Sequence, residues 1–304
     1  MQTIGITGGT GFVGSYICHL LTSQGHQVII FTRGSRKSTS AQVSYAHWDP
    51  AARECDTAAL GRLDAIVHLA GANLAGARWT EKRKKEIRDS RVAATDFLVQ
   101  QLKAHAPNCK TMISASATGF YGPDRPGLIP FTEDAPPYPD FLGELCKDWE
   151  AAARPAADFL RLVIIRFGIV LGRETGAFAE FVKPMSFGIM PILGPGRQIV
   201  CWIHVEDLAR LVCKALQDEK MLGVYNGVAP EPVTHKTLMK TIARIKGGIK
   251  IPAPAPAFVL KLMLGEMSVE ILKSTTVSAQ KVLNTGFSYK FPAIDAAVKD
   301  LLQR

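Results

Sequence analysis

The sequence predicts an α/β protein with a doubly wound parallel sheet, and two features of its 304 residues carry that prediction. Through the first half of the chain, short apolar runs alternate with segments whose apolar residues recur at helical spacing. A glycine-rich stretch follows directly after the first apolar run. Such alternation implies parallel strands joined by right-handed crossovers, with helices on both faces of the sheet.

The apolar runs are the expected buried strands, since they are short and lie between polar or glycine-containing turns. They cover residues 3–7, 27–32, 65–71, 111–116, 162–167 and, later, 224–229. The expected helices cover residues 14–24, 80–105, 141–158 and 205–217, and Gly25 suits the end of the first helix.

The last part of the chain has a different pattern. In "KIPAPAPAFVL" (250–260), alternate prolines favour an extended connector, and a closing helix is expected near 293–303. We therefore expect a sheet domain over residues 1–175, to which residues 200–229 return. A smaller substrate and C-terminal lobe would comprise residues 176–199 and 230–304.

Composition excludes several classes of protein. The hydrophobic fraction of 47% and the charged fraction of 21% are those of a globular chain, and no run approaches the ~18 apolar residues of a membrane span. No leader pattern precedes the first strand, so we expect no membrane association. Six widely spaced cysteines without a C-x-x-C pair predict free thiols, no metal site and a cytoplasmic location.

The net charge of +9 is diffuse, and its densest cluster is "EKRKKEIRDSR" (81–91). Six bases and three acids alternate there, and apolar positions such as Ile87, Leu98 and Leu102 continue at helical spacing. A solvated helix face explains this pattern better than a nucleic-acid interface, because no nucleic-acid motif accompanies it. The excess of positive charge is equally consistent with an anionic small-molecule ligand.

The glycine-rich stretch, "ITGGTGFVGS" (6–15), predicts a phosphate-binding turn between a strand and a helix. One glycine allows the sharp turn, another lets the backbone approach a pyrophosphate, and a third permits close packing of helix on strand. The helix N-terminus then presents free N–H groups to the phosphates. The predicted fold is thus a Rossmann-like doubly wound parallel sheet with a smaller C-terminal substrate lobe.

The second strand indicates which dinucleotide is preferred. NAD-binding sites usually carry Asp or Glu at the end of this strand, to bind the ribose hydroxyls. Here the strand ends "FTRGSRK", so Arg33 takes the place of the acid, and Arg36 and Lys37 follow. Guanidinium groups suit a 2′-phosphate, which predicts NADP(H) as the cofactor.

The chain resembles the extended short-chain dehydrogenase/reductase superfamily, which includes the nucleotide-sugar epimerases and dehydratases. The residues that carry the resemblance are "TGGTGFVG" (7–14), "HLAG" (68–71), "SASATGFYG" (114–122), the segment 176–212 and the tail 254–292. Together they look like the atypical "epimerase family" branch with a small C-terminal domain of unknown function. The resemblance implies a small-molecule substrate bound between two lobes, and since its members often dimerise, a homodimer is one partner to expect.

The cofactor-binding residues expected from the glycine turn, the basic strand end and the resemblance form one set. They are Gly8, Thr10, Gly11, Phe12, Val13, Gly14, Arg33, Arg36, Lys37, Asp49, Leu69, Ala70, Gly71, Phe167 and Gly168. Asp49 belongs to this set because the pair Trp48–Asp49 resembles the place where the superfamily contacts adenine.

The usual catalytic motif of the superfamily is missing. Hydride transfer there uses a Ser or Thr and a Y-x-x-x-K pair, in which the lysine lowers the pKa of the tyrosine. Ser116 fits the serine position, but the tyrosine position falls on Leu142 and the lysine position on Cys146. Lys147 is one residue off and lies about 100° around the helix, so it does not restore the motif.

Four residues could supply a proton donor instead: Tyr121, Tyr138, Cys146 and His204. Each has a structural alternative. Tyr121 could complete the turn after its strand, Cys146 could be a small buried apolar residue, and His204 could pair with nearby acids. Two functions follow from the sequence, an NADP(H)-dependent oxidoreductase or epimerase with a non-standard acid/base, or an inactive NADP(H)-binding sensor or scaffold.

Overall fold

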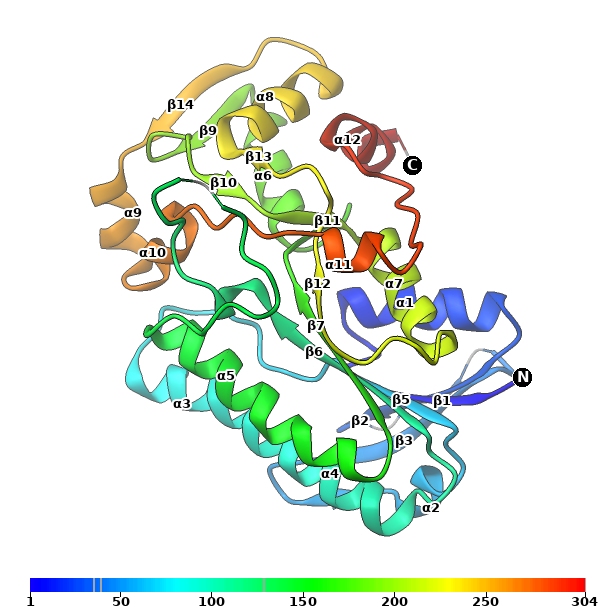
Figure 1. Cartoon of the computed structure of the whole chain (residues 1–304). Coiled ribbons are helices and arrows are strands. Elements are labelled where there is room, and N and C mark those ends of the chain that lie inside the picture. The colour runs from blue at the N-terminus through cyan, green and yellow to red at the C-terminus, as the bar shows by residue number, and fades with distance from the viewer. Residues whose placement is uncertain (35, 39, 128, 304) are drawn as a thin grey trace.

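The computed structural model describes residues 1–34, 36–38, 40–127 and 129–303, and its centre is an eight-stranded sheet (Figure 1). The strand order is β12-β7-β6-β5-β1-β2-β3-β4. Their bounds are β1 (Thr3–Thr7), β2 (Gln27–Thr32), β3 (Val43–Asp49), β4 (Glu54–Cys55), β5 (Ala65–His68), β6 (Thr111–Ala117), β7 (Arg161–Phe167) and β12 (Gly223–Gly227). Neighbouring strands are parallel except β3 and β4. The order reverses between β1 and β5, which confirms the predicted doubly wound sheet.

Helices cover both faces of the sheet, as Figure 1 shows. On one face lie α1 (Phe12–Ser23) and α7 (Val205–Gln217), whose apolar side chains share a core with β1 and β2. On the other face lie α4 (Val92–His105), α5 (Phe141–Ala153) and the short α2 (Thr57–Leu60). The reversal therefore places the carboxyl ends of β1 and β5 beside a crevice, the usual ligand position in this fold.

Apart from α7 and β12, most elements after β7 lie around a second core, which contains Phe178, Trp202, Leu238 and Val298. The strands of this second lobe are β8 (Ile169–Leu171), β9 (Ile189–Leu193), β10 (Ile199–Val200), β11 (Trp202–His204), β13 (Val233–Thr234) and β14 (Ile251–Ala255). Its helices are α6 (Ala177–Met185), α8 (His235–Lys246), α9 (Ala257–Leu264), α10 (Met267–Leu272), α11 (Gln280–Leu283) and α12 (Ile294–Gln303). β8 pairs with β11, β10 with β13 and β9 with β14.

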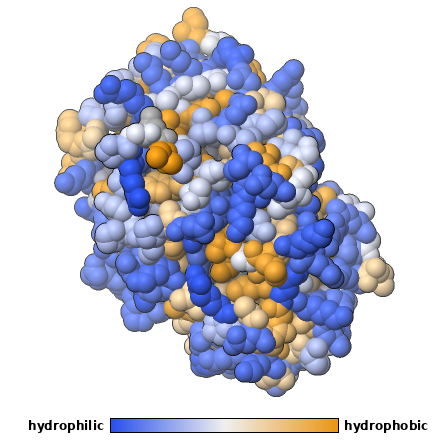
Figure 2. All heavy atoms as spheres, viewed as in Figure 1, coloured by the Kyte–Doolittle hydropathy of each residue, from blue (hydrophilic) through white to orange (hydrophobic). Residues whose placement is uncertain are grey.

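The surface seen in the same orientation is largely hydrophilic, with an apolar strip between α5 and α7 in the lower half of Figure 2. A further apolar area lies at the left edge over α9, where Phe258 and Leu262 are exposed. Within the described residues, no helix combines the length and the hydropathy that a membrane crossing requires. Nor do three or more His, Cys, Asp or Glu side chains gather there as a metal site.

The structure corrects two of the predicted helices. The single helix expected at 80–105 is two helices, α3 (Glu81–Asp89) and α4, because the Ser90 hydroxyl group ends the first. That hydroxyl donates to the Ile87 carbonyl group and accepts from the Ala72 amide, which ties the break to the loop after β5. The helix expected at 141–158 leaves α-helical geometry after Ala153, where a 3₁₀ helix over Arg154–Asp158 begins with a proline.

Two strand assignments also change. β3 was not predicted, since "VSYAHWD" mixes polar and apolar residues and is not a continuous apolar run like the central strands. The proline-rich segment 250–260 is not a free connector, because β14 pairs with β9 and α9 begins at Ala257. Among the described residues, β14 pairs with β9 alone, and such edge strands tolerate prolines.

Candidate cofactor and active site

The glycine stretch forms the sharp turn between β1 and α1. Gly8 has a φ of +73°, and a side chain there would lie 3.0 Å from the backbone of Leu69 and Ala70. The Gly11 amide donates a 3.0 Å hydrogen bond to the Gly8 carbonyl group. A Cβ atom at Gly14 would lie 2.7 Å from Gly9 Cα and closer still to the Gly8 carbonyl oxygen. The turn is therefore too tight for side chains at both of these positions.

The N-terminus of α1 opens onto a cavity of about 320 Å³. Gly11 is the N-cap, no side chain caps the helix, and the first turn carries no acid. The cavity is lined by Thr10, Gly11, Phe12, Ser15, Tyr16, Arg173, Glu174 and Thr175. Uncapped N–H groups at a helix N-terminus suit a phosphate group, and the lining also includes the guanidinium group of Arg173 and the carboxylate of Glu174.

A second cavity of about 320 Å³ lies beyond the end of β2. Its lining consists of Arg33, Gly34, Arg36, Tyr45, Ala46 and His47. The described residues of this lining include two guanidinium groups and no carboxylate, and both arginines are solvent-exposed. The site can therefore accept an anion next to the glycine turn, and it lacks the acid that would bind two free ribose hydroxyls.

The side chains of Trp48 and Asp49, at the end of β3, make contacts within the protein. Trp48 is 3% exposed and stacks on Phe97 with the ring centroids 5.3 Å apart. The Asp49 carboxylate accepts hydrogen bonds of 3.0 and 3.3 Å from the amides of Ala51 and Ala52. These contacts fix the end of β3, which pairs with β2 beside Arg33.

The loop after β5 is held against the glycine turn by a chain of hydroxyl and imidazole groups. The Thr7 hydroxyl oxygen accepts 3.3 Å hydrogen bonds from the amides of Leu69 and Ala70. The His68 ring lies between Thr7 (2.7 Å from Nδ1) and Thr95 (2.9 Å from Nε2). Burial lowers the pKa of His68 to about 4, so the ring is neutral at physiological pH.

The hydrogen bond from Thr95 to Arg91 decides which atoms donate and which accept in this series of hydrogen bonds. The Thr95 hydroxyl group donates to the carbonyl oxygen of Arg91 at 2.6 Å, so its oxygen must accept from His68 Nε2–H. His68 Nδ1 then accepts from the Thr7 hydroxyl group. This chain fixes Leu69 and Ala70 beside Gly8, as a shared cofactor site requires.

Phe167 and Gly168 lie where β7 ends and the second lobe begins. The Gly168 amide donates to the Gly227 carbonyl group at 3.1 Å, and a Cβ atom at Gly168 would lie 2.8 Å from the Cys201 carbonyl oxygen. This glycine lets β7 and β12 pass close to the second lobe, at the same carboxyl edge of the sheet as Gly71.

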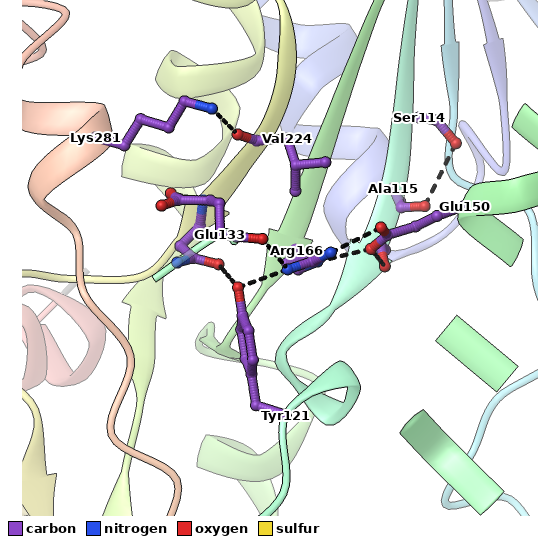
Figure 3. A network of polar contacts seen from close by, with 10 residues as sticks. Ser114, Ala115, Tyr121, Glu133, Glu150, Arg166, Val224 and Lys281 are labelled. Carbon is purple, nitrogen blue, oxygen red and sulfur yellow. Dashed lines mark hydrogen bonds and ion pairs between the residues drawn. The ribbon is translucent and has the colours of Figure 1, made fainter. Parts of the chain in front are cut away.

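Ser116, at the end of β6, is 2% exposed, and its hydroxyl group donates a 2.7 Å hydrogen bond to Glu150 Oε1. Glu150 in turn accepts two hydrogen bonds from Arg166, of 2.7 Å from Nε and 2.8 Å from a terminal nitrogen. This buried ion pair joins β7 to α5 (Figure 3). Neither Glu150 nor Arg166 was predicted from the sequence as part of the site.

Tyr121 belongs to the same network and is fully buried (Figure 3). Its hydroxyl group donates to Asn226 Oδ1 at 2.8 Å and accepts from Arg166 at 2.7 Å. Burial raises the pKa of Tyr121 to about 12 despite the neighbouring guanidinium group. The phenol is thus a weak acid whose hydrogen bonds join β12 to the loop after β6.

The position of the missing tyrosine lies in an apolar cluster, whereas that of the missing lysine is buried near the charges of Glu150 and Arg91. Leu142 packs on Gly119, where an added Cβ atom would lie 3.1 Å from Leu142 Cδ1. Cys146 is 2% exposed, and burial raises its pKa to about 12. A thiol that remains protonated at neutral pH is neither a nucleophile nor a fixed charge.

Tyr138 and His204 lie in different places. Tyr138 is 40% exposed, and its ring lies over Gly122, so no side chain would fit there. His204 is the N-cap of α7, where Nδ1 accepts from the Glu206 amide at 3.1 Å and the ring packs 4.0 Å from that of Phe291. Tyr138 is the more accessible phenol, whereas His204 serves the second lobe.

Two basic residues near these cavities were not singled out from the sequence. Arg173 follows β8 and lines the cavity at α1, while Arg91 lies at the start of α4 beside Cys146. In the sequence, Arg91 belongs to a run of charged residues that indicates a solvated helix face. Arg173 lies near the glycine turn because its neighbour Gly172 packs against the Phe12 ring, a contact that the sequence does not show. Neither has a spacing signal that separates it from an ordinary surface arginine.

The fold and the glycine turn define a dinucleotide-binding α/β protein, and comparisons with known proteins agree. The model of the NAD dependent epimerase/dehydratase family matches residues 4–226, and a domain of unknown function matches residues 255–301. The chain belongs to the NAD dependent epimerase/dehydratase family. The resemblance to the branch with the small C-terminal domain is thereby confirmed.

Individual relatives extend over the whole chain. The epimerase family protein YfhF of Bacillus subtilis is 37% identical over 99% of this chain and 98% of its own. The human epimerase family protein SDR39U1 is 33% identical over 98% of both chains. A crystal structure of human SDR39U1 (isoform2) with NADPH has a TM-score of 0.88, at 30% identity over 99% of each chain. A nucleoside-diphosphate sugar epimerase from Corynebacterium glutamicum has a TM-score of 0.78 at 32% identity, over 99% of this chain and 58% of that one.

Proposed function

We propose that this chain binds NADP(H) along the carboxyl edge of its sheet, with a marked preference over NAD(H). The observation that carries the proposal is the cavity beyond β2. Arg33 and Arg36 line it in place of the acid that would bind the unphosphorylated ribose hydroxyls of NAD(H). The human relative in complex with NADPH supports the same cofactor. The diphosphate would lie at the N-terminus of α1, where side chains on Gly8 and Gly14 would fill the turn.

The residues proposed to contact the cofactor follow the sheet edge. The glycine turn and α1 would bind the diphosphate, Arg33, Arg36 and Lys37 the 2′-phosphate, and residues 69–71 and 167–168 the nicotinamide half. Asp49 stays in this set as a proposed contact to the adenine, because the turn after β3 uses only its Oδ1 atom.

As to activity, we propose an NADP(H)-dependent oxidoreductase or epimerase whose proton donor is not the usual tyrosine. Tyr138 is its most accessible candidate, since the hydroxyl groups of Ser116 and Tyr121 are buried and hydrogen-bonded within the protein. The name of the Corynebacterium relative makes nucleoside-diphosphate sugars the first compounds to test as substrates. The net charge of +9 also favours an anionic substrate.

A second candidate function is a module that binds NADP(H) without hydride chemistry. The specific observation in its favour is Leu142, an apolar residue in the tyrosine position that packs on Gly119. Loss of the nicotinamide absorbance of NADPH with any carbonyl compound or nucleoside-diphosphate sugar would support the enzyme. Binding of NADPH without turnover across such a panel would support the module.

The test of the proposed cofactor is a fluorescence titration of Arg33→Ala with NADPH and NADH. Removal of a charge-assisted contact to the 2′-phosphate should weaken NADPH binding about 10- to 100-fold and leave NADH binding unchanged. Arg62→Ala is the matched control, because Arg62 is an exposed arginine that precedes β5 at the amino edge of the sheet. Equal affinity of the wild-type protein for both coenzymes would refute the 2′-phosphate assignment.

A further inference from the structure

Arg91 is a partly buried arginine at the carboxyl edge of the sheet. It occupies the N-cap position of α4, immediately after the break that ends α3. One terminal nitrogen donates to the Ala72 carbonyl group at 3.0 Å and the other to the Ile87 carbonyl group at 3.3 Å. The guanidinium carbon lies 5.2 Å from the centre of the Trp149 ring, which supports it from α5.

The charge of Arg91 is not balanced by an acid. Among the ion pairs of the described residues, none includes Arg91, and burial lowers its pKa to about 10. A guanidinium group has five N–H donors, and the two backbone carbonyl groups leave others available. The two carbonyl groups and the Trp149 ring offset part of the cost of burying this cation, and an acceptor on a bound ligand would offset more of it.

The neighbours of Arg91 place it beside the missing motif. Its charge acts on Cys146, the residue in the position of the motif lysine. On the other side, a Cβ atom at Gly71 would lie 3.0 Å from the guanidinium carbon, so the loop after β5 passes directly against it. The Arg91 backbone is fixed as well, since its carbonyl oxygen ends the hydrogen-bonded chain through Thr95 and His68.

The location of Arg91 indicates which half of a bound dinucleotide it would contact. In a doubly wound sheet, each set of strands on either side of the reversal holds one nucleotide. The Arg33 cavity lies on the β2–β3 side, whereas Arg91 contacts the loop after β5, on the side where the other nucleotide would bind. The acceptors there are the ribose hydroxyls and the carboxamide oxygen of the nicotinamide nucleotide.

We propose that Arg91 binds the nicotinamide nucleotide of NADP(H) and supplies, from α4, the positive charge that Cys146 cannot supply from α5. The proposal rests on the proposed cofactor and assigns a role to a residue outside the family motif. The helix break at Ser90 makes it possible, because it turns the first residue of α4 towards the loop after β5.

The experiment compares two ligands that share the adenosine half. Arg91→Gln and Arg91→Lys are titrated by calorimetry with NADPH and with adenosine 2′,5′-bisphosphate, which has no nicotinamide nucleotide. Arg91→Gln should bind NADPH about 10- to 100-fold more weakly and bind the bisphosphate as the wild type does, with partial recovery in Arg91→Lys. Arg88→Gln, which removes an equal charge from the surface of α3, should change neither affinity.

The bisphosphate titration also reports whether each variant is folded. Equal weakening of both ligands in Arg91→Gln would show a structural role and overturn the proposal, as would an unchanged affinity for NADPH. If the wild-type protein binds neither ligand, the proposed cofactor itself fails, and the inference about Arg91 fails with it.

Discussion

The Ser116 hydroxyl group donates a 2.7 Å hydrogen bond to the buried carboxylate of Glu150. Because its only proton is committed to that acid, Ser116 can accept a hydrogen bond from a bound molecule but cannot donate one. The serine expected to take part in catalysis is thereby tied to an ion pair that joins β7 to α5. This arrangement separates the chain from a reductase in which serine and tyrosine both face the substrate.

Removal of the Glu150 charge should destabilise the fold. Glu150→Gln leaves Arg166 buried without its counter-ion, and we expect a loss of about 3–5 kcal/mol in the free energy of unfolding, measured with urea. The control Glu144→Gln, which breaks an exposed pair with Lys147, should cost no more than about 0.5 kcal/mol. If the double variant Glu150→Leu/Arg166→Met is no more stable than Glu150→Gln, the uncompensated charge is not the cause.

The glycine turn should not accept even one methyl group at its last glycine, Gly14. In Gly14→Ala, the new Cβ atom would overlap the backbone of Gly8 and Gly9, so the turn must open. We expect a lower midpoint of thermal unfolding and weaker NADPH binding. Gly61→Ala is the control, since its φ is −62° and the nearest atom would lie 3.5 Å away. A Gly14→Ala protein with wild-type affinity for NADPH would argue against diphosphate binding at this turn.

Arg173 should contribute to affinity for the diphosphate. It lines the cavity at the N-terminus of α1, and a hydrogen bond of 3.0 Å from Nε to the Leu301 carbonyl group holds it there. Arg173→Ala should lower the affinity for NADPH and for NADH by about tenfold each, because both coenzymes carry a diphosphate. Weakening of NADPH alone would instead assign Arg173 to the 2′-phosphate.

His68 should make stability depend on pH in the acidic range. Its pKa is lowered to about 4 in the folded chain, so the neutral ring is favoured by folding. The stabilisation is complete above the ordinary pKa near 6.5 and is lost as the pH falls towards 4, at up to about 1.4 kcal/mol per pH unit. His235, with a pKa also lowered to about 4, adds to the same slope.

Unfolding measured at pH values between 4 and 7 should therefore show a shallower slope in His68→Gln and in His235→Gln than in the wild type. The double variant should be shallower than either. Parallel slopes in all four proteins would mean that neither ring is kept neutral by the fold.

The sheet domain could be predicted because local patterns there agree with the final packing. The central strands are continuous apolar runs, and α7 begins at Val205 and ends at Gln217 as its periodicity indicates. β3 was not predicted because one of its faces is partly exposed and carries polar residues, so its sequence is not a continuous apolar run. The helix break at Ser90 was not predicted because it involves a hydrogen bond with the loop after β5, which local sequence does not show.

The site was less accessible to prediction than the fold. The turn and the basic end of β2 are local features, so sequence spacing could indicate them. The buried Glu150–Arg166 pair, the orientation of Arg91 and the burial of Tyr121 depend on contacts between segments far apart in the chain. No spacing rule distinguishes Tyr121 as a buried network member from Tyr121 as a proton donor.

The most direct measurement of the central claim is isothermal titration calorimetry of the wild-type protein with NADPH and with NADH. The two cavities that flank the glycine turn predict saturable binding of NADPH, about 10- to 100-fold tighter than that of NADH. Equal affinities, or no heat with either coenzyme, would contradict the account.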